Sequence, residues 1–231
     1  MNNLCTIGVR KGSKGVPGKN VKLLNGKPLL YYTIQHAKSS GLFDHIVIST
    51  DSEEIQEIGR SHGAQSWFLR PNEFATDEAP KIPAIRHALL ESEKYFRKQF
   101  DVLVDLDVTS PLREVEDIKR AYKQFIDDDA DVLITACESK KNPYFNMVEK
   151  VNGHVELVKN LEQPIGRRQE APKVFDMNAS IYIWKRDVLL NSDTLFTKRT
   201  SLYIMPEERS IDIDSNLDWE FVEFIFSKRK C

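Results

Sequence analysis

A short glycine-rich segment carries the charged side chains that chemistry on a phosphate group would need. Between positions 10 and 20, three glycines alternate with four cations, namely Arg10, Lys11, Lys14 and Lys19. Glycine lets the backbone approach a ligand closely, and guanidinium and ammonium groups offset the charge of a triphosphate. The composition therefore predicts a phosphate-binding loop, although a flexible basic surface loop would contain the same residue types.

The spacing within this loop excludes two familiar nucleotide-binding patterns. A Walker loop that ended at Gly18-Lys19 would need glycine at position 13 and serine or threonine at position 20, where the chain has Ser13 and Asn20. The three glycines stand three residues apart, so the G-x-G-x-x-G dinucleotide pattern is also excluded. A phosphate-binding loop here must belong to another class.

A pair of carboxylates near the end of the chain could hold a metal ion. Asp212 and Asp214 stand two residues apart, flanked by isoleucines. If this segment is a strand, both side chains point to one face and can converge on one hard cation. Mg²⁺ prefers one or two carboxylates together with waters and substrate phosphates, so the pair predicts a magnesium site. An edge strand with a solvated acidic face is the alternative.

A second polar segment follows an apolar run in the middle of the chain. Asp105-Leu106-Asp107 leads into Thr109-Ser110-Pro111 and then Arg113. A strand exit followed by a helix cap would use the same residue types, so this segment alone indicates structure as much as function.

The elements that must position these groups alternate along the chain. Short apolar runs rich in β-branched residues predict strands, and apolar residues at helical spacing predict helices between them. Strands are expected over residues 4–9, 45–50, 101–106, 131–136, 180–184 and 211–214, and helices over 27–40, 52–62, 81–96, 113–125 and 216–226. This alternation is typical of an α/β fold in which helices cover both faces of a mostly parallel sheet. The basic loop then lies at the carboxyl end of the first strand, where such sheets bind ligands.

The regular alternation stops after residue 136. A hairpin is expected over residues 145–151 and 154–158, because Asn152-Gly153 is a strong turn dipeptide. We interpret residues 139–175 as an excursion from a single domain that spans residues 1–231, and such excursions often form dimer contacts.

Bulk composition narrows the class of protein. The chain has 231 residues and a net charge of −2, without the basic excess that is typical of nucleic-acid binders. No segment approaches the roughly 20 apolar residues that cross a bilayer, and the N-terminal residues run directly into a strand pattern, so we expect neither a membrane span nor a signal peptide. The odd number of cysteines, Cys5, Cys137 and Cys231, indicates free thiols in a reducing cytoplasm.

Several of these segments together resemble one family, the acylneuraminate cytidylyltransferases, or CMP-sialic acid synthetases. The resemblance is carried by the loop at 10–20, by Thr109-Ser110-Pro111-Leu112-Arg113, and by the D-x-D at 212–214 just before the last helix. It implies a three-layer, Rossmann-like nucleotide-diphospho-sugar transferase fold. It also implies transfer of CMP from CTP to the anomeric C2 hydroxyl of a nine-carbon sugar acid, with release of pyrophosphate.

The resemblance further implies a set of site residues, a cofactor and a homodimer. The catalytic residues would be Arg10, Lys19 and Asp212, and Mg²⁺ would be held by Asp212 and Asp214. The nucleotide would be bound by Arg10, Gly12, Ser13, Lys14, Lys19, Asn20, Arg70 and Asp77. The sugar acid would be bound, partly across the dimer interface, by Asp107, Arg168, Gln169 and Asn178.

Position 107 bears on which sugar acid is the acceptor. Many members that act on sialic acid have glutamine where this chain has Asp107, and a carboxylate can only accept hydrogen bonds whereas glutamine can also donate them. The wider pattern is most similar to bacterial CMP-legionaminic acid synthetases. Acceptors of the N-acetylneuraminate or pseudaminate type remain alternatives, as does a nucleotide-binding module without turnover.

Overall fold

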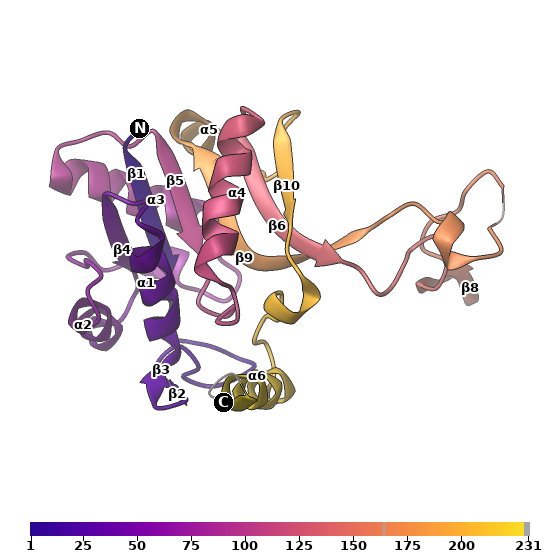
Figure 1. Ribbon diagram of the computed structural model, residues 1–231, viewed down its shortest axis with the longest axis horizontal. Helices are drawn as coiled ribbons and strands as arrows, with labels where there is room; N and C mark the ends of the chain where they lie inside the picture. Colours follow the sequence, from indigo (N-terminus) through magenta and orange to yellow (C-terminus); the bar gives the residue numbers. More distant parts are fainter. Residues whose placement is uncertain (164, 229–231) are drawn as a thin grey trace.

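The computed structural model describes residues 1–163 and 165–228, and its centre is a six-stranded mixed sheet (Figure 1). The strand order is β10-β6-β9-β5-β1-β4, and only β9 runs antiparallel to its neighbours. The strands of this sheet are β1 (Asn3–Gly8), β4 (His45–Ser49), β5 (Val102–Leu106), β6 (Val132–Glu138), β9 (Phe175–Lys185) and β10 (Thr200–Ile204).

Helices cover both faces of the sheet, which gives three layers. On one face, α1 and α4 pack their apolar residues against β1, β5 and β9, with α2 and α6 at the margins. On the other face, α3 and α5 cover the alternate residues of the same strands. The helices are α1 (Leu29–Ser40), α2 (Glu53–Ser61), α3 (Lys81–Phe96), α4 (Val115–Asp127), α5 (Arg186–Asn191) and α6 (Asn216–Lys228).

The sequence explains why the sheet is buried on both faces. Along β5, Leu103 belongs to one apolar core and Val104 to the other, and every residue of the strand is buried. Because successive side chains of a strand point to opposite faces, a strand covered on both sides is mostly apolar. The exception in β5 is Asp105, which is buried and accepts a hydrogen bond from Thr6 at 2.7 Å. The expected α/β architecture with a mostly parallel sheet is confirmed.

Local signals placed several helix ends correctly. Ser52 accepts a hydrogen bond from the backbone N–H of Ile55 at 3.4 Å and so caps α2, as the sequence predicted. Helix α3 has the expected bounds. Helix α4 begins two residues later than expected, because Arg113 lies in the preceding turn, where its side chain is buried.

The order in which the chain adds strands to the sheet reverses at β1. From β1 the chain crosses to β4 on one side, and it later returns to β5 on the other side of β1. Open α/β sheets bind ligands outside the carboxyl ends of their strands at such a switch point. The loops that follow β1 and β5 both begin there.

An arm extends away from the sheet between β6 and β9 (Figure 1). Its hairpin pairs β7 (Val148–Val151) with β8 (His154–Leu157). Asn152 and Gly153 at the turn both have positive φ, as a two-residue hairpin of this kind requires. The expected hairpin is therefore present.

Three expectations about the secondary structure were wrong or incomplete. Residues 211–214 have no regular secondary structure, so the expected strand is absent there. The edge strand β10 and the short helix α5 were not predicted. A short two-stranded ribbon, β2 (Leu23–Leu24) with β3 (Lys27–Pro28), was also missed and takes the start of the expected first helix.

Two of the cysteines can be placed. Cys5 is buried in the core and Cys137 is half-buried, and both are free thiols; Cys231 lies outside the described residues. Among the helices of the described chain, none has the length and apolar content that a bilayer span requires.

Candidate active site

A cavity of about 430 Å³ opens at the carboxyl ends of β1 and β5. The loop after β1, the start of α3, the segment after β5 and the segment before α6 form its walls. Most of the sequence-predicted site residues line it: Arg10, Gly12, Ser13, Lys14, Lys19, Asn20, Arg70, Asp77, Asp107, Asp212 and Asp214. Residues that are up to 200 positions apart in sequence therefore meet at the predicted edge of the sheet.

The basic loop is held in shape by its own polar side chains. Asn20 donates from Nδ2 to the backbone oxygen of Arg10 at 3.0 Å, which closes the two ends of the loop. Ser13 donates from Oγ to the oxygen of Val16 at 2.6 Å. These two hydrogen bonds hold the backbone of the loop, while the side chains of Arg10, Lys14 and Lys19 line the cavity.

Gly15 brings this loop against the carboxylate segment. A Cβ atom at this position would lie 1.7 Å from the backbone oxygen of Asp214. No side chain fits at that separation, so the glycine is required for close approach of the two backbones. The contact explains how a loop after the first strand and a segment before the last helix share one cavity.

The cations of the loop pair with carboxylates inside the cavity. Arg10 lies 2.6 Å and Lys14 2.8 Å from the two oxygens of Asp77. Lys19 lies 3.3 Å from Asp214 and also donates to the backbone oxygen of Ile213. Hydrogen bonds from Lys14 and Arg10 hold the pKa of Asp77 below its ordinary value. An incoming polyphosphate would exchange these partially exposed pairs for its own oxygens.

Arg70 forms the wall behind the first strand. Its guanidinium donates to the backbone oxygen of Ser49 at 2.6 Å and to Oγ of the same residue at 3.1 Å. Burial lowers the pKa of Arg70, but the group stays cationic at any physiological pH. The side chain is therefore a rigid positive charge close to the backbone of Gly8.

Asp212 is the carboxylate with the most unusual surroundings in the cavity. Its Oδ1 atom is buried and has no hydrogen-bond partner. Burial raises the pKa of Asp212 to about 6, and the negative charges of Asp107 and Asp214 act in the same direction. A buried carboxylate oxygen without a hydrogen-bond donor carries a charge that a hard cation could offset. Among the described residues, however, no three His, Cys, Asp or Glu side chains are grouped closely enough to form a complete metal site.

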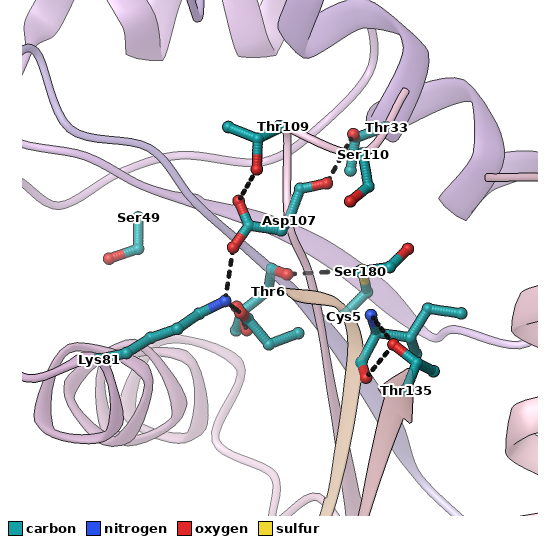
Figure 2. A network of polar contacts seen from close by, with 12 residues as sticks. Cys5, Thr6, Thr33, Ser49, Lys81, Asp107, Thr109, Ser110, Thr135 and Ser180 are labelled. Atoms are coloured by element: carbon teal, nitrogen blue, oxygen red, sulfur yellow. Dashed lines mark hydrogen bonds and ion pairs between the residues drawn. The ribbon is translucent and has the colours of Figure 1, made fainter. Parts of the chain in front are cut away.

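A lysine that the sequence analysis did not select lies on the opposite wall. Lys81, the first residue of α3, places Nζ 2.8 Å from Asp107 and 3.0 Å from Asp105, and 4.3 Å from the centre of the Tyr182 ring. Figure 2 shows Lys81 pointing at Asp107 while Thr109 meets the same carboxylate from the other side. Burial opposes ionisation of Asp107, but Lys81 outweighs it and lowers the pKa of this carboxylate.

Arg113 joins the segment after β5 to strand β9 through hydrogen bonds to the backbone. Its guanidinium is buried and donates to the backbone oxygens of Ser180 at 2.7 Å and Asp107 at 3.2 Å. Burial lowers its pKa to about 10. The motif that contains Arg113 was recognised in the sequence, but its structural task was not; a lone arginine in a turn gives no sign that it is buried.

The structure does not bring the remaining predicted acceptor residues to the cavity. Arg168 and Gln169 lie on the arm, where Arg168 donates to the backbone oxygen of Ser139 at 2.9 Å. Asn178 is buried in β9; its amide accepts from Thr135 at 2.7 Å and donates to Ser210 at 3.0 Å. Within this chain, Asn178 therefore has a structural role in the sheet, because its hydrogen-bonding groups are already used.

Comparison with known proteins supports the family that the motifs indicated. A protein-family model described as cytidylyltransferase matches residues 4–222. The chain belongs to the cytidylyltransferase family. It is 49% identical over 226 residues to post-translational flagellin modification protein B of Campylobacter coli, a match that covers 98% of this chain and 95% of the relative.

This cytidylyltransferase is also similar to a second sequence relative and to a solved structure. It is 49% identical over 224 residues to the CMP-N,N'-diacetyllegionaminic acid synthase of Campylobacter jejuni, covering 97% of this chain and 94% of the relative. Its fold is similar to that of a CMP:2-keto-3-deoxy-manno-octonic acid synthetase complexed with CTP, with a TM-score of 0.71. That alignment covers 99% of this chain and 100% of the other at 17% identity, so it supports the fold alone.

Proposed function

We propose that this cytidylyltransferase transfers CMP from CTP to the C2 hydroxyl of a nine-carbon sugar acid of the legionaminic type and releases pyrophosphate. The single observation that carries the proposal is the shared cavity, in which the basic loop, Asp107 and the pair Asp212 and Asp214 face one another. The 49% identity to a CMP-legionaminic acid synthase supports the choice of acceptor.

The loop cations would bind the triphosphate. Arg10, Lys14 and Lys19 lie in partially exposed pairs with Asp77 and Asp214, so phosphate oxygens can replace those carboxylates at small cost. In the transfer, the acceptor oxygen bonds to the α-phosphorus and the bond to the pyrophosphate oxygen breaks. The protein then contributes mainly position and charge, and Arg10 and Lys19 would offset the charge that develops on the α-phosphoryl group.

Asp212 and Asp214 would hold Mg²⁺. The unpartnered Oδ1 of Asp212 and its raised pKa fit a group that becomes fully stable only beside a cation. When bound, Mg²⁺ would neutralise phosphate charge and polarise the reacting groups.

The proposal is tested by a coupled pyrophosphate assay. Purified protein with Mg²⁺ is offered CTP, GTP, UTP or ATP in turn, against legionaminate, N-acetylneuraminate, pseudaminate and the eight-carbon acid Kdo. We expect pyrophosphate release with CTP and the highest kcat/KM with legionaminate. Release with none of the acids would refute the function, and a higher kcat/KM with another acid would correct the acceptor.

We also infer that the protein acts as a homodimer through the arm, in the cytoplasm. A two-stranded hairpin is marginally stable alone, and Val148 and Val155 on the arm are 62% and 69% exposed. A second copy would cover such side chains, and it would let Arg168 and Gln169 reach the partner's acceptor site. The free thiols of Cys5 and Cys137 fit a reducing compartment.

A further inference from the structure

Lys81 occupies a position that the transfer of CMP does not by itself explain. Its ammonium lies 2.8 Å from Oδ2 of Asp107 and 3.0 Å from Oδ2 of Asp105, and its side chain lines the same cavity. The aspartates are not equivalent: the side chain of Asp105 is 1% exposed, whereas that of Asp107 is 23% exposed. Asp107 is therefore the carboxylate of the pair that a substrate can reach.

The two oxygens of Asp107 each have a donor. Thr109 donates from Oγ1 to Oδ1 at 3.2 Å, and Lys81 donates to Oδ2 at 2.8 Å. Two donors from opposite sides fix the plane of a carboxylate, while each oxygen keeps a lone pair for another donor. Figure 2 shows this arrangement, with Asp107 between Thr109 and Lys81.

Lys81 is itself fixed rather than free to move. Its Nζ lies over the face of Tyr182, 4.3 Å from the ring centre, and Thr6 donates to the far oxygen of Asp105 at 2.7 Å. Proline at position 80 starts the helix that carries Lys81. The ammonium is thus held by two carboxylates and one aromatic face, and its positive charge interacts with Asp105, Asp107 and Tyr182.

The charge of the wall matters because the proposed acceptor is an anion. Besides Asp107, the cavity wall contains Asp212 and Asp214, and a carboxylate of the acceptor would approach all of these. Without Lys81 the acceptor would meet an uncompensated negative charge at Asp107. Like charges a few ångströms apart repel strongly where water is partly excluded.

We propose that Lys81 is a positioning residue for the acceptor: by pairing with Asp107 and fixing its carboxylate, it reduces the negative charge that an anionic sugar acid meets at this wall. The inference rests on the proposed function. It concerns only the acceptor, since Lys81 makes no contact with the basic loop that would bind CTP. A change at Lys81 should therefore separate the two substrates in kinetics.

The test is a cycle of K81M, D107N and the double variant in the pyrophosphate assay. Methionine keeps the aliphatic stem, which matters because Lys81 also borders a neighbouring apolar cavity of about 660 Å³. We expect K81M to raise the KM for the sugar acid on the order of tenfold and to leave the KM for CTP within about twofold of wild type. The double variant should have a lower acceptor KM than K81M, because it lacks the more exposed of the two carboxylates that lose their cation when Lys81 is replaced.

Two further variants separate charge from folding. K81R keeps the charge and should stay near the wild-type acceptor KM. K98M is the matched control, because Lys98 also pairs with an aspartate, Asp44, at 3.4 Å and lies over a ring, that of Phe100, but lies outside the cavity. Thermal melting of every variant shows whether it is folded.

Each outcome decides something. An acceptor KM for K81M within twofold of wild type overturns the inference, as does a K81R enzyme that is as impaired as K81M. Equal acceptor KM values for K81M and the double variant also overturn it, because the loss would then not act through Asp107. If K81M does not fold, K81R and D107N still test the role of charge. A wild-type enzyme without activity on any acid refutes the proposed function, and the Lys81 inference falls with it.

Discussion

At the scale of single residues, the cavity contains a carboxylate whose ionisation reduces the stability of the folded protein. Asp212 has a buried oxygen without a partner, and its pKa is raised to about 6 by burial. A carboxyl whose pKa is higher in the folded than in the unfolded protein costs stability when it ionises. Such a group is expected where function requires a charge that packing alone would remove.

Asp212→Asn should therefore stabilise the protein in the absence of metal. The folded pKa of about 6 lies above the ordinary value of 3.8, so the cost of ionisation is absent below pH 4 and complete above pH 6. In EDTA, the stability gain of the variant should grow between those limits to at most about 3 kcal/mol. Urea unfolding at several pH values measures it, and a gain independent of pH would contradict the assigned cause. Activity should be lost, and Mg²⁺ should remove the stability advantage.

Lys19→Ala should keep the fold and lose most turnover with CTP. Removing one charge that offsets the transferring phosphate should lower kcat/KM on the order of 10²- to 10³-fold. Lys11→Ala is the matched control, since Lys11 is exposed in the same loop but does not line the cavity. Steady-state pyrophosphate release measures both variants. A Lys19→Ala enzyme as active as the Lys11→Ala enzyme would remove Lys19 from the site.

At the scale of elements, the site depends on two irregular segments that press together. The loop after β1 meets residues 211–214 at Gly15, where their backbones are too close for any side chain. Neither segment forms part of a strand or a helix. Their shape is therefore set by specific contacts, such as those of Asn20 and Lys19, rather than by a regular hydrogen-bond ladder.

Gly15→Ala should disturb both segments. The added methyl group would lie 1.7 Å from the backbone oxygen of Asp214, so the loop or the carboxylate must move. Overpacking of this kind costs about 1–3 kcal/mol, and we also expect the KM for CTP to rise. Gly12→Ala, where a Cβ would meet no atom within 4 Å, should leave the melting temperature unchanged. Equal melting temperatures for the two variants would argue against the close contact.

The sequence predicted elements better than it predicted contacts between them. Periodicity gave α3 its bounds, and Ser52 and Asn152-Gly153 marked a helix start and a turn, because these signals are local. No strand forms at 211–214, because alternating apolar and acidic residues also suit an irregular segment in which Ile213 is buried and Ile211 is partly buried. Lys81 was missed since its role arises only when the start of α3 meets the end of β5.

Family resemblance supplied what spacing could not. It brought Arg70 and Asp77 into the site, although nothing in their own surroundings in the sequence indicates the cavity. It also suggested Asn178, which the structure places in the sheet with its amide already bonded to Thr135 and Ser210. Motif membership therefore located the residues of the nucleotide side correctly in the cavity, but it did not do so for Asn178.

At the scale of the whole molecule, the arm is the part least connected to the core. It leaves the sheet after β6 and returns at β9 (Figure 1). Its hairpin carries exposed apolar side chains. On one face of the hairpin lie Val148, Val155 and Leu157, because Val148 pairs with Leu157 and Val155 with Lys150. An apolar face on an isolated ribbon is unstable in water unless another surface covers it.

Val148→Lys together with Val155→Lys should convert the proposed dimer to a monomer. Two charges on the apolar face of the hairpin would have to be desolvated at the interface, which is costly. Size-exclusion chromatography with light scattering reports the mass directly. Leu90→Lys is the control, since Leu90 is 48% exposed on α3, away from the arm. A wild-type monomer, or a double variant that remains a dimer, would contradict the role of the arm.

The antiparallel course of β9 has a consequence for how such enzymes can diversify. Glu138 at the end of β6 pairs with Phe175 at the start of β9, so the arm leaves and re-enters the sheet at adjacent positions. Residues can thus be gained or lost between these two points by mutation without changing the register of the sheet or the loop after β1. Selection can remodel the arm over generations while the machinery for the nucleotide is inherited unchanged.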